Sequence, residues 1–260
     1  MDTTTPHSAR VWNYWLGGQD HYPVDREVGD AYRKQFPGID AIAKASREFL
    51  ARAVRYLVQD GGIRQFLDVG TGLPTHDNTH QIAQRYAPDA RIVYVDHDPL
   101  VLLHAEALLT STPQGSTTYL EADLHDPAAV LAGALTPVGP LSRAAPIALI
   151  LSDVLGHVPD HDTARDVVRR LVDGLPPGSY LMICHGTTES PDAALAAQDA
   201  YNSSGAIPYI PRTRDQIRDL FGGLELVAPG LVPVPDWRPA IGPAAITPGA
   251  GLGAIARIPR

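Results

Sequence analysis

Short apolar runs alternate with segments of helical character along most of the chain. The runs with strand character cover residues 65–69, 91–95, 117–120, 146–151 and 180–184, and the helical segments between them cover 79–86, 100–109, 130–135 and 163–175. Most of the apolar runs lack the period-two alternation of a sheet with one solvated face. This order is typical of a parallel sheet with helices on both faces, so we predict an α/β fold.

Both ends of the chain add elements to this pattern. Thr213 and Gln216 have the spacing of a capping box, which predicts a helix that runs to Phe221. Two further strands are predicted over 224–227 and 252–258. Near the amino end, residues 39–58 have helical spacing and are followed by two glycines. We therefore divide the chain into an amino-terminal appendage or lid over residues 1–60 and one compact domain over residues 61–260.

The appendage carries two of the three tryptophans, Trp12 and Trp15, in one short turn or helix. Two interpretations stay open: these rings pack against the core, or the segment closes over a binding site and excludes water. In the second case the lid comprises Tyr14, Asp20, His21 and Tyr22. A second cover is expected from residues 187–212, where Tyr201, Tyr209 and Arg212 are suited to an aromatic or acidic small molecule.

Composition narrows the function classes. The chain has 260 residues with 21 Lys and Arg against 29 Asp and Glu, a formal net charge of −8. This balance disfavours a protein that grips a nucleic-acid backbone, although it leaves room for a local basic patch. The single cysteine, Cys184, excludes an intramolecular disulfide and a cysteine-rich zinc cluster. No signal peptide or membrane segment is visible, so we expect a cytoplasmic protein that does not contact a membrane.

The strongest chemical signal is the sequence FLDVGTG at residues 66–72, where the first predicted strand meets the next helix. Gly70 and Gly72 allow a sharp turn and a close approach of a ligand to backbone N–H groups. The dinucleotide fingerprint needs a third small residue three positions after Gly72. Thr75 occupies that position, so the fingerprint is broken.

Three carboxylates follow three successive predicted strands. Asp68 lies in the end of the first strand, where it needs a donor or a cationic partner if it is buried. Asp96 ends the second strand at the spacing expected of an acid that binds ribose hydroxyls. Asp123 ends the third strand, where it can accept from an adenine amino group. Acids beside a glycine turn without phosphate-binding chemistry indicate a cationic adenosine ligand, and S-adenosylmethionine has these properties.

The sequence resembles a known family in the segments FLDVGTGLPT, RIVYVDHDPLVL, YLEADLHDP, ILSDVLGHVPD and LPPGSYLMICH. They are similar to the actinobacterial S-adenosylmethionine-dependent methyltransferases of largely unknown substrate, the DUF574 family, as is RVWNYWLGGQDHYPVDR near the amino end. The resemblance implies a class I methyltransferase fold, a Rossmann-like, mostly parallel sheet of seven strands with residues 252–258 antiparallel. It also implies a cofactor site comprising Asp68, Gly70, Thr71, Gly72, Asp96, His97, Asp123, Leu124 and Ser152.

On the acceptor side the protein must hold a nucleophile in line with the methyl–sulfur bond. The fourth predicted strand ends near that point, and we predict His157, Asp153 and Tyr14 as the catalytic residues. Asp153 is a departure, because an apolar residue is expected there. His157 is suited to act as a base, or it is a satisfied core histidine. The clusters around His157 and around His76 lack a recognised ligand spacing, so no metal is expected.

The leading hypothesis is methyl transfer from S-adenosylmethionine to a small-molecule acceptor. Two alternatives stay open: a non-catalytic sensor that binds S-adenosylmethionine or S-adenosylhomocysteine, and, less favoured because of Thr75, an NAD-dependent oxidoreductase. No nucleic-acid partner is expected. The sequence leaves a homodimer open and does not identify the acceptor.

Overall fold

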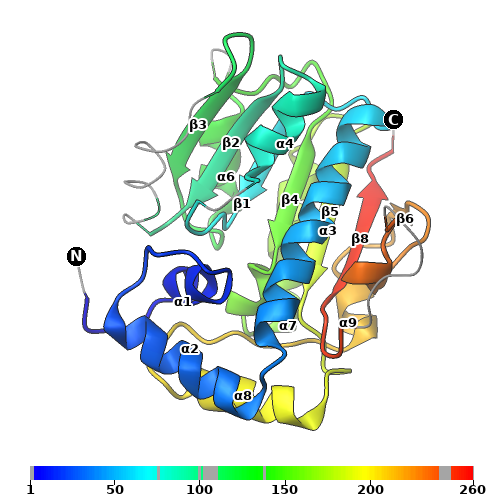
Figure 1. The fold of residues 1–260 in the computed structure, drawn as a ribbon. Helices are drawn as coiled ribbons and strands as arrows, with labels where there is room; N and C mark the ends of the chain where they lie inside the picture. The colour runs from blue at the N-terminus through cyan, green and yellow to red at the C-terminus, as the bar shows by residue number, and fades with distance from the viewer. Residues whose placement is uncertain are drawn as a thin grey trace.

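The computed structural model describes residues 3–74, 77–98, 101, 111–136, 139–239 and 247–259. In these ranges one sheet of eight strands has the order β3-β2-β1-β4-β5-β8-β6, with the short β7 paired to β8 (Figure 1). The strands are β1 (Gln65–Val69), β2 (Arg91–Asp96), β3 (Ser116–Glu121), β4 (Ala148–Ser152), β5 (Tyr180–His185), β6 (Glu225–Leu226), β7 (Val232–Pro233) and β8 (Leu252–Arg257). All five strands of the alternating pattern lie where the apolar runs predicted them.

The first five strands run parallel, and β8 lies antiparallel between β5 and β6. The predicted α/β fold and the antiparallel carboxyl-terminal strand are therefore confirmed. The sheet gains an eighth strand over the predicted seven because the two residues of β7 also pair with β8. Such a short pairing leaves no periodic signal in a sequence. Because β1 to β5 share one direction, their carboxyl ends meet at a single edge of the sheet.

Alternate side chains of the strands pack on two helical layers. Leu67 and Val69 of β1 face one layer, and Phe66 of the same strand faces the other. The first layer contains α6 (Pro127–Ala134), α7 (His161–Asp173) and α9 (Arg214–Asp219), and the second contains α3 (Ile39–Gln59) and α4 (Thr79–Tyr86). Both faces of β1, β2, β4 and β5 are largely buried, which explains why these strands lack the alternation of a half-exposed sheet.

Three helices gather beyond the carboxyl ends of the parallel strands (Figure 1). We name α1 (Ser8–Trp15), α2 (Pro23–Gln35) and α8 (Asp192–Asn202) the helical cap. They share a separate apolar cluster that includes Trp15, Tyr32 and Tyr201. The first of these helices was predicted as a turn or helix, whereas α2 and α8 were not predicted, because neither has a continuous apolar stripe.

The long helix α3 joins the cap to the sheet. Its buried residues Phe49, Leu57 and Val58 belong to the core cluster of the sheet, whereas Ile39 and Ala43 near its start belong to the cluster of the cap. The division at residue 60 stays a prediction. The helix predicted over 100–109 lies almost entirely outside the described residues. Among the helices that the structure describes, none combines the length and the apolar character needed to cross a membrane.

Candidate functional site

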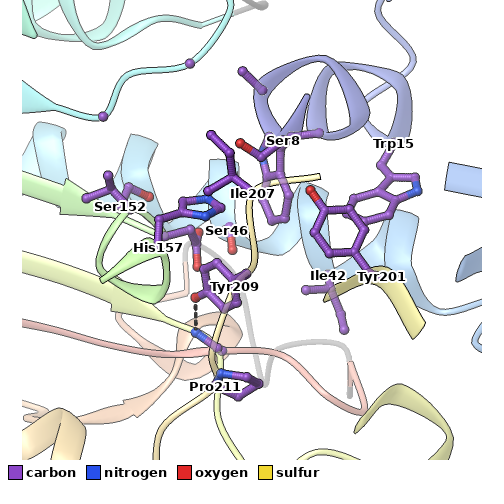
Figure 2. A pocket seen from close by; sticks show the side chains of 18 of the residues that line it. Ser8, Trp15, Ile42, Ser46, Ser152, His157, Tyr201, Ile207, Tyr209 and Pro211 are labelled. Atoms are coloured by element: carbon purple, nitrogen blue, oxygen red, sulfur yellow. Dashed lines mark hydrogen bonds between the residues drawn. The ribbon is translucent and has the colours of Figure 1, made fainter. Parts of the chain in front are cut away.

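A cavity of about 340 Å³ lies between the carboxyl edge of the sheet and the helical cap. Every one of the nine predicted cofactor residues lines it: Asp68, Gly70, Thr71, Gly72, Asp96, His97, Asp123, Leu124 and Ser152. Figure 2 shows Ser152 and His157 on one side and Trp15, Tyr201 and Ile42 on the other, with Ser46 and Tyr209 between them. The cavity therefore has a strand-end side and a cap side.

The glycine turn after β1 is held against the next strand. The backbone N–H of Gly70 donates to the carbonyl of Val95 at 2.8 Å. Gly70 and Gly72 have φ values of 72° and 62°, in the left-handed region that side chains other than that of glycine rarely adopt. A Cβ at Gly70 would collide with the side chain of Val154, whereas a Cβ at Gly72 would make only an ordinary van der Waals contact with the Cβ of Ala9, at 3.9 Å. Steric crowding therefore restricts position 70 to glycine more strongly than position 72.

Asp68 is a buried carboxylate at the end of β1. Thr79 of α4 donates to its Oδ2 at 2.6 Å. Burial raises the pKa of Asp68 to about 6, while the hydrogen bond from Thr79 and the charge of Arg47 act in the opposite direction. A carboxylate in this state gains from a cationic ligand, because an ammonium group would offset the lost hydration.

Asp96 is the last residue of β2, and Asp123 lies shortly after the end of β3. Asp96 is 9% exposed, and its carboxylate accepts from the backbone N–H of Gly72 at 3.0 Å and of Asp98 at 3.1 Å. Asp123 is more exposed and accepts from the backbone N–H of His125 at 2.9 Å, a hydrogen bond that lowers the pKa of Asp123. Both carboxylates border the cavity at separate points along the sheet edge.

Among the described residues that line the cavity, Arg47 of α3 is the one arginine. It was not predicted from the sequence. Its guanidinium donates to the carbonyl of Asp77 at 3.2 Å and interacts electrostatically with Asp68. Burial lowers the pKa of Arg47 from its usual high value. No sequence motif surrounds Arg47, because α3 lies in the appendage and reaches the site only through the packing of the fold.

These side chains indicate a class of ligand. Besides Asp153, described below, the carboxylates of Asp68, Asp96 and Asp123 line the strand-end side together with the guanidinium of Arg47. A diphosphate would face Asp68 and Asp96 at close range without a compensating set of cations. A ligand with an amino group, vicinal hydroxyls and no phosphate matches these groups, since carboxylates accept from each of its donors.

His157 lies in a short 3-10 helix, Leu155–His157, directly after β4. Its Nδ1 is 2.8 Å from the carbonyl oxygen of Pro208, and a carbonyl can only accept, so Nδ1 carries the proton. Burial lowers the pKa of His157, which keeps the ring neutral near pH 7. The lone pair of the neutral ring is therefore on Nε2, the arrangement required of a general base.

Asp153 adopts a left-handed conformation, with φ of 57°, between β4 and this short helix. Its carboxylate accepts hydrogen bonds from Ser46, Cys184 and Tyr209. Burial raises the pKa of Asp153 and also that of the Cys184 thiol, which stays protonated and donates. The hydroxyl of Tyr209 also accepts from the backbone N–H of Gly186 at 2.8 Å. Asp153 thus anchors the ring of Tyr209, which meets His157 edge to face at 5.4 Å.

The structure does not bring Tyr14 into the cavity. Its hydroxyl donates to Asp30 at 2.7 Å, and the guanidinium of Arg33 lies over its ring. The predicted catalytic role of Tyr14 therefore has no geometric support, because side chains of α2 engage it on the far side of α1. The other predicted lid residues, Asp20, His21 and Tyr22, also lie outside the described lining.

Other residues of α1 cover the site instead. His7, Ser8 and Ala9 line the cavity at the start of α1, and Trp12 and Trp15 line it further along. Nε2 of His7 lies 3.3 Å from the carboxylate of Asp98, which brings the start of α1 close to the segment after β2. The first helix thus covers the cavity with side chains other than the four named for the lid, and its closure over a ligand stays a prediction.

Arg212 is also absent from the lining of the cavity. It is 2% exposed and donates to the carbonyl oxygens of Leu155 and Val158, so it braces the turn that carries His157. The expectation that Arg212 holds an acidic ligand is wrong for this reason. Tyr201 and Tyr209 do line the cavity, as predicted.

The histidine clusters have structural partners. Asp160 caps α7 by accepting from Thr163, and His161 contacts Asp219 at 3.0 Å. His76 lies outside the described residues. Within the described ranges, no three histidine, cysteine or acidic side chains come together in a geometry that could hold a metal ion.

Comparisons with known proteins agree with this geometry. A family model described as S-adenosyl methyltransferase matches residues 1–259. No curated protein matches the chain. The crystal structure of a DUF574 family protein from Streptomyces avermitilis is similar over 99% of both chains, with 43% identity and a TM-score of 0.93. A candidate methyltransferase from Thermobifida fusca is 36% identical over 100% of this chain and 97% of its own, with a TM-score of 0.89.

A more distant likeness concerns the fold alone. The N-methyltransferase NodS from Bradyrhizobium japonicum, crystallised with S-adenosyl-L-homocysteine, shares 14% identity. The alignment covers 96% of this chain and all of NodS with a TM-score of 0.50.

Proposed function

Because the chain belongs to the S-adenosyl methyltransferase family, we propose that it methylates a small molecule held under the helical cap, with His157 as the general base. The family makes S-adenosylmethionine the methyl donor, and it bears out the resemblance, the enzyme class and the cofactor predicted from the sequence. It also decides against the nicotinamide alternative, in agreement with the broken dinucleotide fingerprint.

One observation carries the proposal. A single cavity joins the carboxylates of the sheet edge to an apolar compartment of the cap, and His157 lies in its wall. This arrangement places a donor site and an acceptor site side by side in one cavity, which methyl transfer requires.

The strand-end side is assigned to the methyl donor by its chemistry. Asp68 takes the amino group, and Arg47 takes the carboxylate of the methionine part. Asp96 takes the ribose hydroxyls, and Asp123 with the apolar Leu124 takes the adenine. Gly70, Thr71 and Gly72 leave room for the backbone to approach the ligand. His97 and Ser152 complete the wall.

The bound sulfonium supplies an activated methyl group, so the protein has two tasks: to align the acceptor and to remove its proton. His157 performs the second task through Nε2, because the carbonyl of Pro208 holds the proton on Nδ1. Asp153 is a positioning residue: it fixes Tyr209, and the ring of Tyr209 supports the imidazole of His157.

The test combines calorimetry with product detection. We expect S-adenosylhomocysteine to bind the wild type and the variant His157→Gln equally well. Methyl transfer to an acceptor that needs deprotonation falls about 10²- to 10⁴-fold in His157→Gln, the usual contribution of a general base. His161→Gln is the matched control, since His161 contacts Asp219 and lies outside the cavity lining.

Two outcomes would overturn the proposal. Tight binding of S-adenosylmethionine without methyl transfer to any hydroxyl, amine or carbon acceptor in a broad panel would favour the sensor alternative. Methyl transfer to DNA or RNA, with affinity that falls steeply as salt rises, would replace the small-molecule acceptor.

A further inference from the structure

The cap side of the cavity is lined mainly by rings and aliphatic side chains from segments that are distant in sequence, with Asn13 and Gln198 among its polar members. The rings and aliphatic side chains include Trp12 and Trp15 of α1, Tyr32 of α2, Ile42 of α3, and Leu195 and Tyr201 of α8. This composition favours an occupant that buries a large apolar area.

Charge is confined to the other side. Among the described lining residues, the charged side chains are Arg47, Asp68, Asp96, Asp123 and Asp153, all on α3 or at strand ends. A charged group on the cap side would lose its hydration without gaining a counterion, which is costly. The acceptor is therefore uncharged where it contacts the cap.

The ring geometry favours a flat aromatic occupant over an aliphatic one. Trp15 meets Tyr32 at a centroid distance of 5.0 Å with planes at 62°, and it meets Tyr201 at 6.2 Å with planes at 47°. Rings inclined to one another in this way present both edges and faces. A further aromatic ring gains edge-to-face or offset contacts on such walls.

Tyr201 supplies a polar anchor in this apolar wall. Its side chain is 7% exposed, and its hydroxyl has no hydrogen-bond partner among the described residues. Figure 2 shows the hydroxyl of Tyr201 pointing toward the middle of the cavity. The neighbouring Tyr32 differs, because its hydroxyl donates to the carbonyl of Ala194 at 3.3 Å. Burial raises the pKa of Tyr201, so its hydroxyl stays a neutral donor.

We infer that the acceptor is an uncharged, planar hydroxyaryl compound whose reacting hydroxyl faces His157 and whose second oxygen accepts from Tyr201. The inference rests on the proposed function and deepens it. A phenolic hydroxyl has an ordinary pKa of about 10, within reach of a neutral imidazole, whereas an aliphatic alcohol is a far weaker acid.

The transfer balances without a further reactant. The acceptor proton moves to Nε2 of His157, and the acceptor oxygen forms a bond to the methyl carbon. The carbon–sulfur bond breaks with both electrons left on sulfur, which yields S-adenosylhomocysteine and a methyl aryl ether. His157 then releases its proton to water.

The experiment measures binding in the presence of saturating S-adenosylhomocysteine, so that its readout is independent of turnover. The probes are 2,7-dihydroxynaphthalene, the charged 6-hydroxy-2-naphthoate and the aliphatic 1,4-cyclohexanedimethanol. Quenching of tryptophan fluorescence reports occupancy, since Trp12 and Trp15 line the cap side. Trp237 gives a constant background, because it is fully buried against Phe49 and Tyr56.

We expect dihydroxynaphthalene to bind at least about 10-fold more tightly than either other probe. Tyr201→Phe keeps the ring, removes the hydroxyl and weakens this binding about 5- to 10-fold, the range for one neutral hydrogen bond. Tyr86→Phe is the matched control, because Tyr86 is exposed and outside the cavity. If 1,4-cyclohexanedimethanol bound as tightly as 2,7-dihydroxynaphthalene, or if 6-hydroxy-2-naphthoate bound more tightly, the proposed acceptor class would be wrong.

The two proposals fail in distinguishable ways. If S-adenosylhomocysteine itself does not bind, the proposed function is wrong. If it binds and dihydroxynaphthalene does not, only the hydroxyaryl inference is wrong. If Tyr201→Phe bound 2,7-dihydroxynaphthalene as tightly as the wild type, the hydroxyl of Tyr201 would not be the hydrogen-bond donor to the acceptor.

Discussion

The two sides of the cavity are built in different ways. On the strand-end side, the ligand-facing groups follow successive strands within 66–72, 96–97 and 123–124, and the parallel register aligns them. On the cap side, α1, α2 and α8 meet through side chains, and the sequence separation between Tyr32 and Ala194 is 162 residues. The strand-end side is thus encoded in short stretches of sequence, whereas the cap side is formed by tertiary contacts between distant segments.

The forces that hold the two sides differ as well. The strand ends are fixed by backbone hydrogen bonds such as that from Gly70 to Val95. The cap depends on a buried ion pair between Arg10 and Asp25 at 2.8 Å, with side chains 5% and 0% exposed. Gly29 of α2 lets α1 approach, since a Cβ there would lie 2.7 Å from the ring of Tyr14. The cap can therefore change its lining without altering the donor site.

The largest expected effect comes from removing one partner of the buried ion pair. Arg10→Met leaves the carboxylate of Asp25 buried without its cation, a change that costs about 3–5 kcal/mol. We expect the free energy of unfolding in urea to fall by this amount. In hydrogen exchange, α1 and α2 should lose protection before the strands of the sheet do, because the cap has its own apolar cluster.

Arg33→Met is the matched control for this prediction. Arg33 pairs with Asp40 at 3.0 Å, but both side chains are partly exposed, so the loss should stay below about 1 kcal/mol. Equal destabilisation by the two variants, or simultaneous exchange of cap and sheet, would contradict a separately held cap.

A smaller effect, confined to the strand-end side, is expected from Gly70→Ala. The new Cβ would meet Val154 in a backbone conformation that already costs about 1–2 kcal/mol. We expect the affinity for S-adenosylhomocysteine to fall more than about 100-fold by calorimetry, or about 3 kcal/mol. Binding of a cap-side ligand alone should change much less.

Gly62→Ala separates collision from backbone strain. Gly62 has a similar φ of 69° with nothing within 4 Å of a Cβ, and it lies far from the cavity lining. The variant Gly62→Ala should lower the free energy of unfolding slightly and leave the affinity for S-adenosylhomocysteine unchanged. If Gly72→Ala, whose Cβ would meet only Ala9 at an ordinary contact distance of 3.9 Å, were as damaging as Gly70→Ala, the collision with Val154 would not be the cause.

The sequence was informative wherever structure is encoded within a few residues. The apolar runs gave β1 to β5 within one or two residues, and the capping box of Thr213 and Gln216 is formed as predicted. The helix α2 was missed, because it has no continuous apolar stripe. Its stability comes from packing on α1 and α8, which no local pattern reports.

The same distinction applies to the site. Asp68, Asp96 and Asp123 were placed in the cavity because each follows a strand, and strand ends meet by topology. Arg47 and His7 were missed, and Tyr14, which was predicted to be catalytic, does not line the cavity. Which face of α1 turns inward is decided by its contacts with α2, such as those of Trp15 with Gly29 and of Tyr14 with Arg33, and the sequence of α1 alone does not report them.

The smallest expected effect comes from the buried charge of Asp68, which lowers the stability of the ligand-free protein but raises its affinity for the ligand. Burial raises the pKa of Asp68 to about 6 in the folded protein, above its ordinary value of 3.8. The free energy of unfolding of the ligand-free protein therefore falls as pH rises from about 4 to about 6, and the penalty persists at neutral pH. A shift of about two units corresponds to a penalty on the order of 3 kcal/mol.

Asp68→Asn removes the charge and keeps an acceptor for the hydroxyl of Thr79. At pH 7 the ligand-free variant should gain on the order of 1–3 kcal/mol in urea unfolding, since the buried charge is gone. Its affinity for S-adenosylhomocysteine should fall about 10- to 100-fold, because the amino group loses its carboxylate. The wild type should also bind more weakly below pH 6, and the variant should lack this dependence.

Asp123→Asn is the control with the opposite stability effect. Hydrogen bonds from His125 lower the pKa of Asp123, so this more exposed carboxylate stabilises the fold at neutral pH, and its loss brings no gain. If Asp68→Asn lost stability as well as affinity, Asp68 would act as a structural acceptor for Thr79. The strand-end side would then be held by its carboxylates, as the cap is by Asp25, and the contrast between the two sides would fail at its most buried charge.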